Sequence, residues 1–419
     1  MSSSSLVLNL QKLAFAGEAA AISARHALSL GISSCSTTLE SDANVAELLS
    51  SVERPTRVFL KVGYDATTQL HSLDPEKVHS SLSNSALVSL ASSNPNVIVT
   101  AVAHNPEELR LSSPDDYMER WSDAFEAFSS AATSNMISSF GLCSNGLSLP
   151  PSHPLHLSLA ESLMCVENLP PSSDPEKFTT VMYPFNPLET LATSQIPSTR
   201  TFETISYRPL QAYPDGGTGS GHPFKLVDHL VPTSADLSDS LVSTHELSSP
   251  PAPYEDSLSL AMGHFDAEGL VSEMGDRTLT PEERETVDGC KLLQGMLVEQ
   301  DRVLGSVRSL AVYNSDLATS VIPLIRENFE EMDEESSDVL ASFFRWHGVA
   351  VRCHTAWATR RLLSEGGEDG KDEHHVIPSD QSLQSYSLSY SLSQKGIDMV
   401  ELGMPKVEYV DDILKSGAS

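Results

Sequence analysis

Two side chains suited to proton transfer each follow an apolar run of the sequence. Lys61 comes directly after VFL (58–60), and His104 comes directly after VIVTAVA (97–103). A lysine in an apolar setting needs an opposite charge or a lowered pKa, because an unpaired buried ammonium is costly. Histidine titrates near neutrality and can therefore give or take a proton at physiological pH. The pair indicates acid–base chemistry; the alternatives are a surface lysine and a loop-capping histidine.

The elements that must position these residues are short β-branched runs that alternate with longer helix-like segments. The runs cover 12–17, 32–37, 57–63, 97–103, 137–143, 178–184, 202–207 and 397–402. Eight such runs predict an α/β fold, a (β/α)8 TIM barrel. Functional side chains of such a barrel lie at the C-terminal ends of its strands. We expect Lys61 and His104 there.

The second half of the chain is less regular. Residues 214–280 are rich in Ser, Pro, Gly and acid, which predicts a loop-rich insertion with at most short elements. A helical block over 281–363 gives the barrel an extended helical C-terminal half, and an acidic, Ser-rich segment over 364–394 is expected to be flexible. We expect one barrel domain over 1–419.

Composition excludes several classes of partner. Lys and Arg total 26 against 57 Asp and Glu, a net charge of −31, so nucleic acid and anionic membranes are disfavoured. No apolar run approaches the roughly 20 residues that span a bilayer. The N-terminus lacks the features of a secretory signal, and five widely spaced cysteines suit reduced thiols. A soluble protein of the cytoplasm is expected. No recognised zinc spacing occurs over 347–375, so no metal site is predicted.

Read in order, the motifs at the ends of the runs resemble those of the aldo/keto reductase superfamily. The resemblance extends from about residue 17 to 414, with a gap at 214–280. The motifs are LKVGY (60–64), AHNPEE (103–108), WSDAFEAF (121–128), GLCSNG (141–146), FTTVMYPFNPLE (178–189), YRPL (207–210) and VELGMPKVEYVDDIL (400–414). Each motif is weak alone, and their shared order carries the resemblance.

The resemblance implies a catalytic lysine at Lys61 and a catalytic histidine at His104. In the family a tyrosine is the proton donor, the lysine lowers its pKa and an aspartate pairs with the lysine. Alignment without gaps places Ser36 at the aspartate and Ser41 at the tyrosine. A serine hydroxyl is a far weaker acid than a phenol, so the chain departs from the family at half of its catalytic residues.

Three substitutes for the missing residues stay open. Tyr64 is the tyrosine nearest to Lys61 in sequence, Glu40 or Asp42 would replace the aspartate if the loop realigned, and a protonated His104 is a third possible acid. Of the three substitutes, His104 is favoured because histidine titrates near neutral pH.

The resemblance also implies an NADP(H) site. Ser144 and Asn145 would hydrogen-bond the nicotinamide carboxamide, and Tyr207 would stack on its ring. The turn Gly403-Met404, which opens the last helix, would receive the adenosine phosphate, with Lys406 as an added cation. Two positions depart from the family: Met182 replaces a glutamine and Pro405 replaces an arginine.

Two functions follow from these residues. The first is NADPH-dependent reduction of a small carbonyl substrate, weak or altered in scope. The alternative is a catalytically inactive barrel that serves as a nucleotide- or metabolite-binding or protein-interaction module, and a scaffold that uses the 214–280 insertion is a variant of it. The sequence identifies neither a substrate nor a protein partner.

Overall fold

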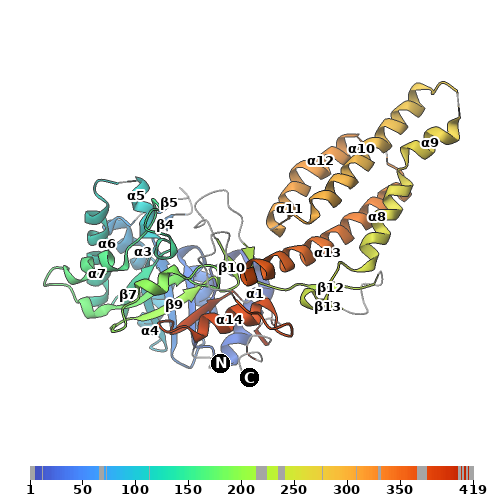
Figure 1. The fold of residues 1–419 in the computed structure, drawn as a ribbon. Coiled ribbons are helices and arrows are strands. Elements are labelled where there is room, and N and C mark those ends of the chain that lie inside the picture. The colour runs from blue at the N-terminus through green and yellow to red at the C-terminus, as the bar shows by residue number, and fades with distance from the viewer. Residues whose placement is uncertain are drawn as a thin grey trace. The chain divides into compact units, whose positions relative to one another are not determined.

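The computed structural model divides the chain into two compact units, Met1–Gly219 with Ser387–Ser419, and Ser220–Tyr386 (Figure 1). The residues that it describes are 5–11, 13–65, 70–71, 73–112, 114–213, 224–234, 241–275, 277–307, 309–328, 332–365, 375–403, 407, 410, 411 and 414.

The first unit is a closed barrel of eight parallel strands. Its strands are β1 (Leu6–Asn9), β2 (Ser34–Thr38), β3 (Thr56–Val62), β6 (Val97–His104), β7 (Ser139–Cys143), β8 (Phe178–Pro184), β9 (Glu203–Tyr207) and β14 (Met399–Leu402). Their order around the barrel is β1-β14-β9-β8-β7-β6-β3-β2. The predicted (β/α)8 TIM barrel is confirmed.

Helices alternate with the strands over most of the barrel unit (Figure 1). They are α1 (Leu13–Ser29), α2 (Asp42–Leu49), α3 (Pro75–Ser83), α4 (Ala86–Ser93), α5 (Leu109–Ser112), α6 (Tyr117–Thr133) and α7 (Leu159–Glu167). Between β8 and β9 the only helical segment is a short 3-10 helix, Leu191–Gln195. The connection from β9 to β14 contains the whole second unit and then α14 (Leu383–Ser393).

One predicted strand is wrong. The run 12–17 was expected to form the first strand, but Leu6–Asn9 forms it, and Leu13–Ser29 is a helix bent at Gly17, whose φ is +71°. Lys12 lies outside the described residues. The reason for the error is that LAFAGEAAA is apolar and rich in alanine, the best helix former, and a short apolar run has no period that separates strand from helix.

Side chains that point into the barrel form a compact apolar layer: Val7, Phe59, Val102, Cys143, Met182, Ile205, Tyr207 and Met399. Because side chains alternate along a strand, residues two positions away also point inward. At the N-terminal end of the strands these include Arg57 and Glu203, which form an ion pair. At the C-terminal end they include Lys61 and Glu401.

The second unit is mainly helical. Its helices are α8 (Ala252–His264), α9 (Ala267–Met274), α10 (Pro281–Leu304), α11 (Leu310–Asp316), α12 (Ile322–Asn328) and α13 (Glu334–Glu365), and a π-helical turn, Leu317–Val321, joins α11 to α12. Its short strands are β11 (Phe224–Lys225), β12 (Leu230–Pro232) and β13 (Leu241–Ser243). The remaining short strands of the chain are β4 (Tyr64–Asp65), β5 (Leu70–His71) and β10 (Gln211–Ala212).

The sequence predicts a single domain with a loop-rich insertion at 214–280, and the number of domains stays a prediction; the second unit is described here by itself. It has its own apolar core, to which α8 contributes Tyr254 and Ala261 and α13 contributes Phe343 and Trp346. The helical block over 281–363 is found, but α8 and α9 lie within the segment 214–280. The sequence does not predict these helices because the segment is rich in serine and proline, and both residues are poor helix formers. Similarly, α14 lies within the segment expected to be flexible.

In the part of the chain that the structure describes, none of the helices combines the length and the apolar character that crossing a membrane requires.

Candidate functional site

Lys61 is held by a carboxylate that the sequence analysis did not name. Its Nζ lies 3.1 Å from both Oε1 and Oε2 of Glu401. Glu401 belongs to β14, and strands β2 and β1 lie between β14 and the strand of Lys61, β3. Only 3% of the lysine side chain and 2% of the glutamate side chain are exposed. Asn9 of β1, which lies between β14 and β2 in the barrel, donates a further hydrogen bond to Glu401. The buried ammonium therefore has the opposite charge that it needs.

The register of β2 explains why no serine takes this role. Ser36 is the neighbour of Phe59, whereas Thr38 is the neighbour of Lys61. Ser36 is fully buried inside the barrel, one layer below the lysine. Ser41 is also buried, and its hydroxyl donates to the backbone carbonyl of Gln11 at 2.7 Å. Both serines are thus part of the packed barrel, and Ser41 ties the end of β2 to the end of β1.

Asp42, one of the possible substitutes for the aspartate, has another task. Its carboxylate accepts hydrogen bonds from the Ser85 hydroxyl at 3.0 Å and from the backbone N–H groups of Ala86 and Leu87 at 2.6 and 3.0 Å. These donors are at the N-terminus of α4, where backbone N–H groups have no partners within the helix. Asp42 therefore caps α4 rather than pairing with Lys61.

His104 ends β6 on the face that points into the barrel, two residues beyond Val102. Its register neighbour on β7 is Cys143, which belongs to the interior layer. Burial raises the pKa of the Cys143 thiol to about 12, so this cysteine is protonated at neutral pH. The structure therefore brings His104 and Lys61 to the same end of the barrel, as the sequence predicts.

Asn145 accepts hydrogen bonds from two side chains at the end of β9, those of Tyr207 and Arg208. The Tyr207 hydroxyl donates to Asn145 Oδ1 at 2.9 Å, and Arg208 Nη2 donates to the same oxygen at 2.7 Å. The Lys61 ammonium lies 5.2 Å from the centre of the Tyr207 ring, over its face. Burial raises the pKa of Tyr207 well above its usual value. The ring and the hydroxyl of Tyr207 thus both contact other groups of the protein.

Arg208 adopts a backbone conformation that few residues take. Its φ is +60°, and a proline follows it. This left-handed conformation costs an L-residue about 1 kcal/mol or more, and it persists only where the surroundings fix it. Here the guanidinium lies 4.7 Å from the centre of the Tyr213 ring and contacts Asn145. Nothing in the sequence pattern YRPL indicated this arrangement.

Ser144 is fully buried and points at a buried acid rather than at open space. Its hydroxyl donates to Glu107 Oε2 at 2.7 Å, and the Gly146 N–H donates to Glu107 Oε1 at 2.9 Å. Burial raises the pKa of Glu107 to about 7, although both hydrogen bonds act in the opposite direction. Glu107 therefore joins the loop after β6 to the loop after β7.

The remaining cofactor positions are only partly described. Gly403 directly follows β14 and is exposed, whereas Met404, Pro405 and Lys406 lie outside the described residues. Met182 is fully buried in the interior layer of the barrel.

These side chains fit a nicotinamide carboxamide poorly. A carboxamide needs a donor and an acceptor that face it, but the proton of the Ser144 hydroxyl is directed to Glu107 and Asn145 Oδ1 already accepts two hydrogen bonds. The thioether of Met182 is at best a weak acceptor. The donors and acceptors of these side chains are thus directed to protein groups and not to a nicotinamide.

Glu401 is the site residue that sequence reasoning missed. The signal was an acid in an otherwise apolar strand, MVEL, at a position that alternation directs into the barrel.

Among the described residues, no group of three His, Cys, Asp or Glu side chains is arranged to hold a metal ion.

No family model matches this sequence, and no curated protein matches it. Among solved structures, it is similar to an aldo-keto reductase from Bacillus halodurans in its holo form, with 10% sequence identity and a TM-score of 0.43. The match covers 99% of this chain and 87% of that one. The barrel assignment rests on the order and pairing of the strands themselves.

Proposed function

We propose that this chain is a barrel of the aldo/keto reductase type that does not reduce carbonyls and that serves as a protein-interaction module. The observation that carries the proposal is the orientation of Tyr207, whose ring face lies against the Lys61 ammonium while its hydroxyl donates to Asn145. No phenol hydroxyl among the described contacts of Lys61 is placed for the proton transfer that the resemblance implies.

The orientation of Tyr207 argues against proton transfer. A lysine assists a phenol by placing positive charge beside the phenolate oxygen, which lowers the pKa of the phenol. Glu401 balances the charge of Lys61, as the aspartate does in the family, but the tyrosine next to Lys61 presents its ring face instead of its hydroxyl. The pKa of Tyr207 is raised by burial, so that its phenol is a weaker acid than usual. A good general acid at neutral pH would have the opposite shift.

A slow reductase is the second candidate, and one observation favours it. His104 ends its strand on the inner face of the barrel, at the same end as Lys61. An imidazolium there would be a competent proton donor to a bound carbonyl. This reading predicts turnover that His104→Gln abolishes.

The deciding experiment measures cofactor binding and turnover on the full-length protein. We expect NADPH to leave its melting temperature unchanged, and a panel of aldehydes and ketones with NADPH to react no faster than without protein. Lys61→Met and Lys77→Met, the latter an exposed lysine of α3, should then behave alike.

Turnover of about 1 s⁻¹ or faster, in the range of ordinary enzymes, would overturn the proposal if Lys61→Met removed it and Lys77→Met did not. Slower turnover that depends on His104 would support the second candidate instead.

A further inference from the structure

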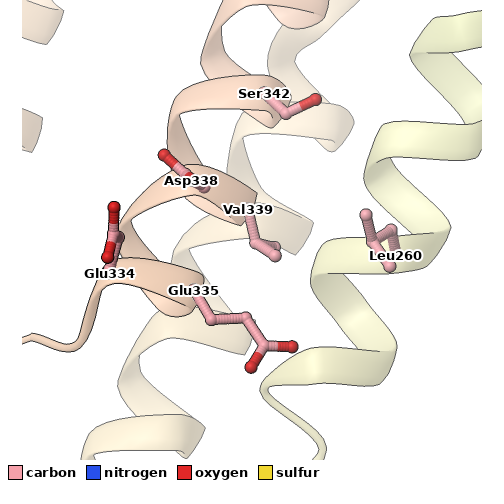
Figure 2. A pocket seen from close by; sticks show the side chains of 6 residues that line it. All are labelled: Leu260, Glu334, Glu335, Asp338, Val339 and Ser342. Atoms are coloured by element: carbon pink, nitrogen blue, oxygen red, sulfur yellow. The ribbon is translucent and has the colours of Figure 1, made fainter.

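A groove between α8 and α13 lies within the second unit (Figure 2). Its volume is about 540 Å³, within the range of roughly 300–1,000 Å³ typical of sites that bind ligands. The residues that line it are Leu260, Glu334, Glu335, Asp338, Val339 and Ser342.

Two of the side chains that line the groove, Leu260 and Val339, are apolar. Leu260 of α8 is 57% exposed, and Val339 of α13 is part of the core of this unit. Figure 2 shows Leu260, Val339 and Glu335 facing one another across the gap between the two helices. A single exposed leucine is ordinary on a convex surface, but this one borders a hollow that another apolar side chain would fill.

The rim is acidic, and none of the described residues that line the groove is a lysine or an arginine. Glu335 borders the gap, and Glu334 and Asp338 stand on the adjacent side of α13 (Figure 2). All three are exposed, and no ion pair recorded among the described residues involves them. Glu334 and Asp338 are four residues apart on one helix, a spacing at which like charges repel by about 0.2–0.5 kcal/mol. A cation bound at the rim would relieve this repulsion.

The walls of the groove are held by groups beneath it. The ring of His264 on α8 is hydrogen-bonded to the Ser336 hydroxyl of α13 at 2.8 Å. Asp333 caps α13 by accepting from the Ser336 N–H at 2.7 Å and from its hydroxyl at 3.0 Å. Ala261 of α8 also belongs to the core shared with α13. The groove is thus formed before any partner arrives, which lowers the entropic cost of binding.

From these features we infer that the groove docks a short, basic amphipathic helix of another protein. Its apolar residue would cover Leu260 and Val339, and its Lys or Arg residues would pair with Glu334, Glu335 and Asp338. Helix-in-groove recognition uses this combination of apolar anchors and flanking charge. The acidic rim excludes nucleic acid and anionic lipid as occupants. The inference rests on the interaction role of the proposed function and deepens it by naming the chemistry of the partner, while the binding test gives the same answer whether or not the barrel is active.

The test uses the full-length protein and a fluorescein-labelled peptide of leucine and lysine with leucines at i, i+3, i+4 and i+7. Fluorescence anisotropy should show saturable binding. The triple variant E334Q/E335Q/D338N should weaken binding about tenfold, and Leu260→Ser should weaken it by a similar factor. The matched control is E282Q/E285Q/D288N, which removes the same charge from exposed positions of α10.

Three results would overturn the inference. They are equal weakening by the two triple variants, equal affinity for a peptide of the same composition with scrambled order, and absence of saturable binding. All substituted residues are exposed, and circular dichroism with thermal melting shows that each variant is folded before its affinity is compared.

Discussion

At the scale of residues, the positive charge of Lys61 is the feature around which the barrel mouth is organised. Sequence alignment directs attention to Ser36, because that is where the family has its aspartate. The structure supplies a carboxylate from the opposite side of β1 instead, through Glu401 on β14. The sequence predicts that Lys61 and His104 lie at the same end of the barrel. It does not predict the partner of Lys61, because Glu401 is distant in sequence and comes near Lys61 only when β14 closes the barrel against β1.

We predict that Glu401→Gln destabilises the protein by about 3–5 kcal/mol, since it leaves a buried ammonium without its counter-charge. Urea unfolding measures this free energy. The double variant Lys61→Met with Glu401→Gln should recover a large part of the loss, because the uncompensated charge is gone. Strictly additive effects of the two substitutions would contradict the coupling, and Glu53→Gln, at an exposed position, is the control.

Glu107 gives the barrel a pH dependence of a defined sign. Burial raises its pKa in the folded protein from 4.5 to about 7. The folded state therefore binds this proton more tightly than the unfolded state, so its contribution is most favourable below about pH 4.5 and is lost as pH rises to about 7. We predict that Glu107→Gln melts progressively higher than the unsubstituted protein from pH 5 to pH 8.

Gln fits this position because its amide oxygen can accept from the Gly146 N–H while its amide nitrogen donates to the Ser144 hydroxyl. Melting temperatures at pH 5, 6, 7 and 8 provide the measurement, with Glu126→Gln, an exposed position of α6, as the control. A difference that stays constant across this range would show that Glu107 is ionised to the same extent in both states.

At the scale of elements, a strand can be predicted from the sequence where burial of its faces produces a run of apolar residues. Run 97–103 is apolar except for Thr100 because helices and the barrel interior cover its two faces, and β6 contains the whole run. Residues 13–17 are also mostly apolar but belong to α1, since core-facing helices and buried strands share that composition. Helix α8 was not predicted because its serines mask its buried face, which includes Tyr254 and Ala261.

The cap on α4 yields a prediction at this scale. Asp42 accepts two backbone N–H groups and one hydroxyl at the start of that helix, so Asp42→Ala should lower the unfolding free energy by about 2–3 kcal/mol. Asp42→Asn should cost less, because its amide oxygen keeps part of the cap. Urea unfolding compares both with Asp123→Ala on the exposed side of α6. A loss no larger than that of the control would show that the cap is dispensable.

At the scale of the whole molecule, the apolar clusters of the barrel unit and the cluster of the second unit share none of the described residues. The clusters of the barrel unit fill the barrel and the space beneath its helices, and the cluster of the second unit joins α8, α10, α11 and α13. The second unit also has its own polar centre. Asp228 accepts from Arg360 Nη2 at 2.6 Å and from the Leu383 N–H at 2.7 Å, with its side chain fully buried.

We predict that Asp228→Ala weakens the second unit selectively, because it leaves the Arg360 guanidinium without its counter-charge and the Leu383 N–H without its acceptor. The expected loss is about 3–5 kcal/mol, as for other broken buried ion pairs. Hydrogen–deuterium exchange read by peptide mass spectrometry should show faster exchange over 224–365, while the barrel strands keep their protection. Glu401→Gln should produce the converse pattern. If either substitution accelerated exchange equally in both units, the two cores would unfold as one cooperative structure, and the barrel could not be regarded as a scaffold that carries a separately stable helical unit.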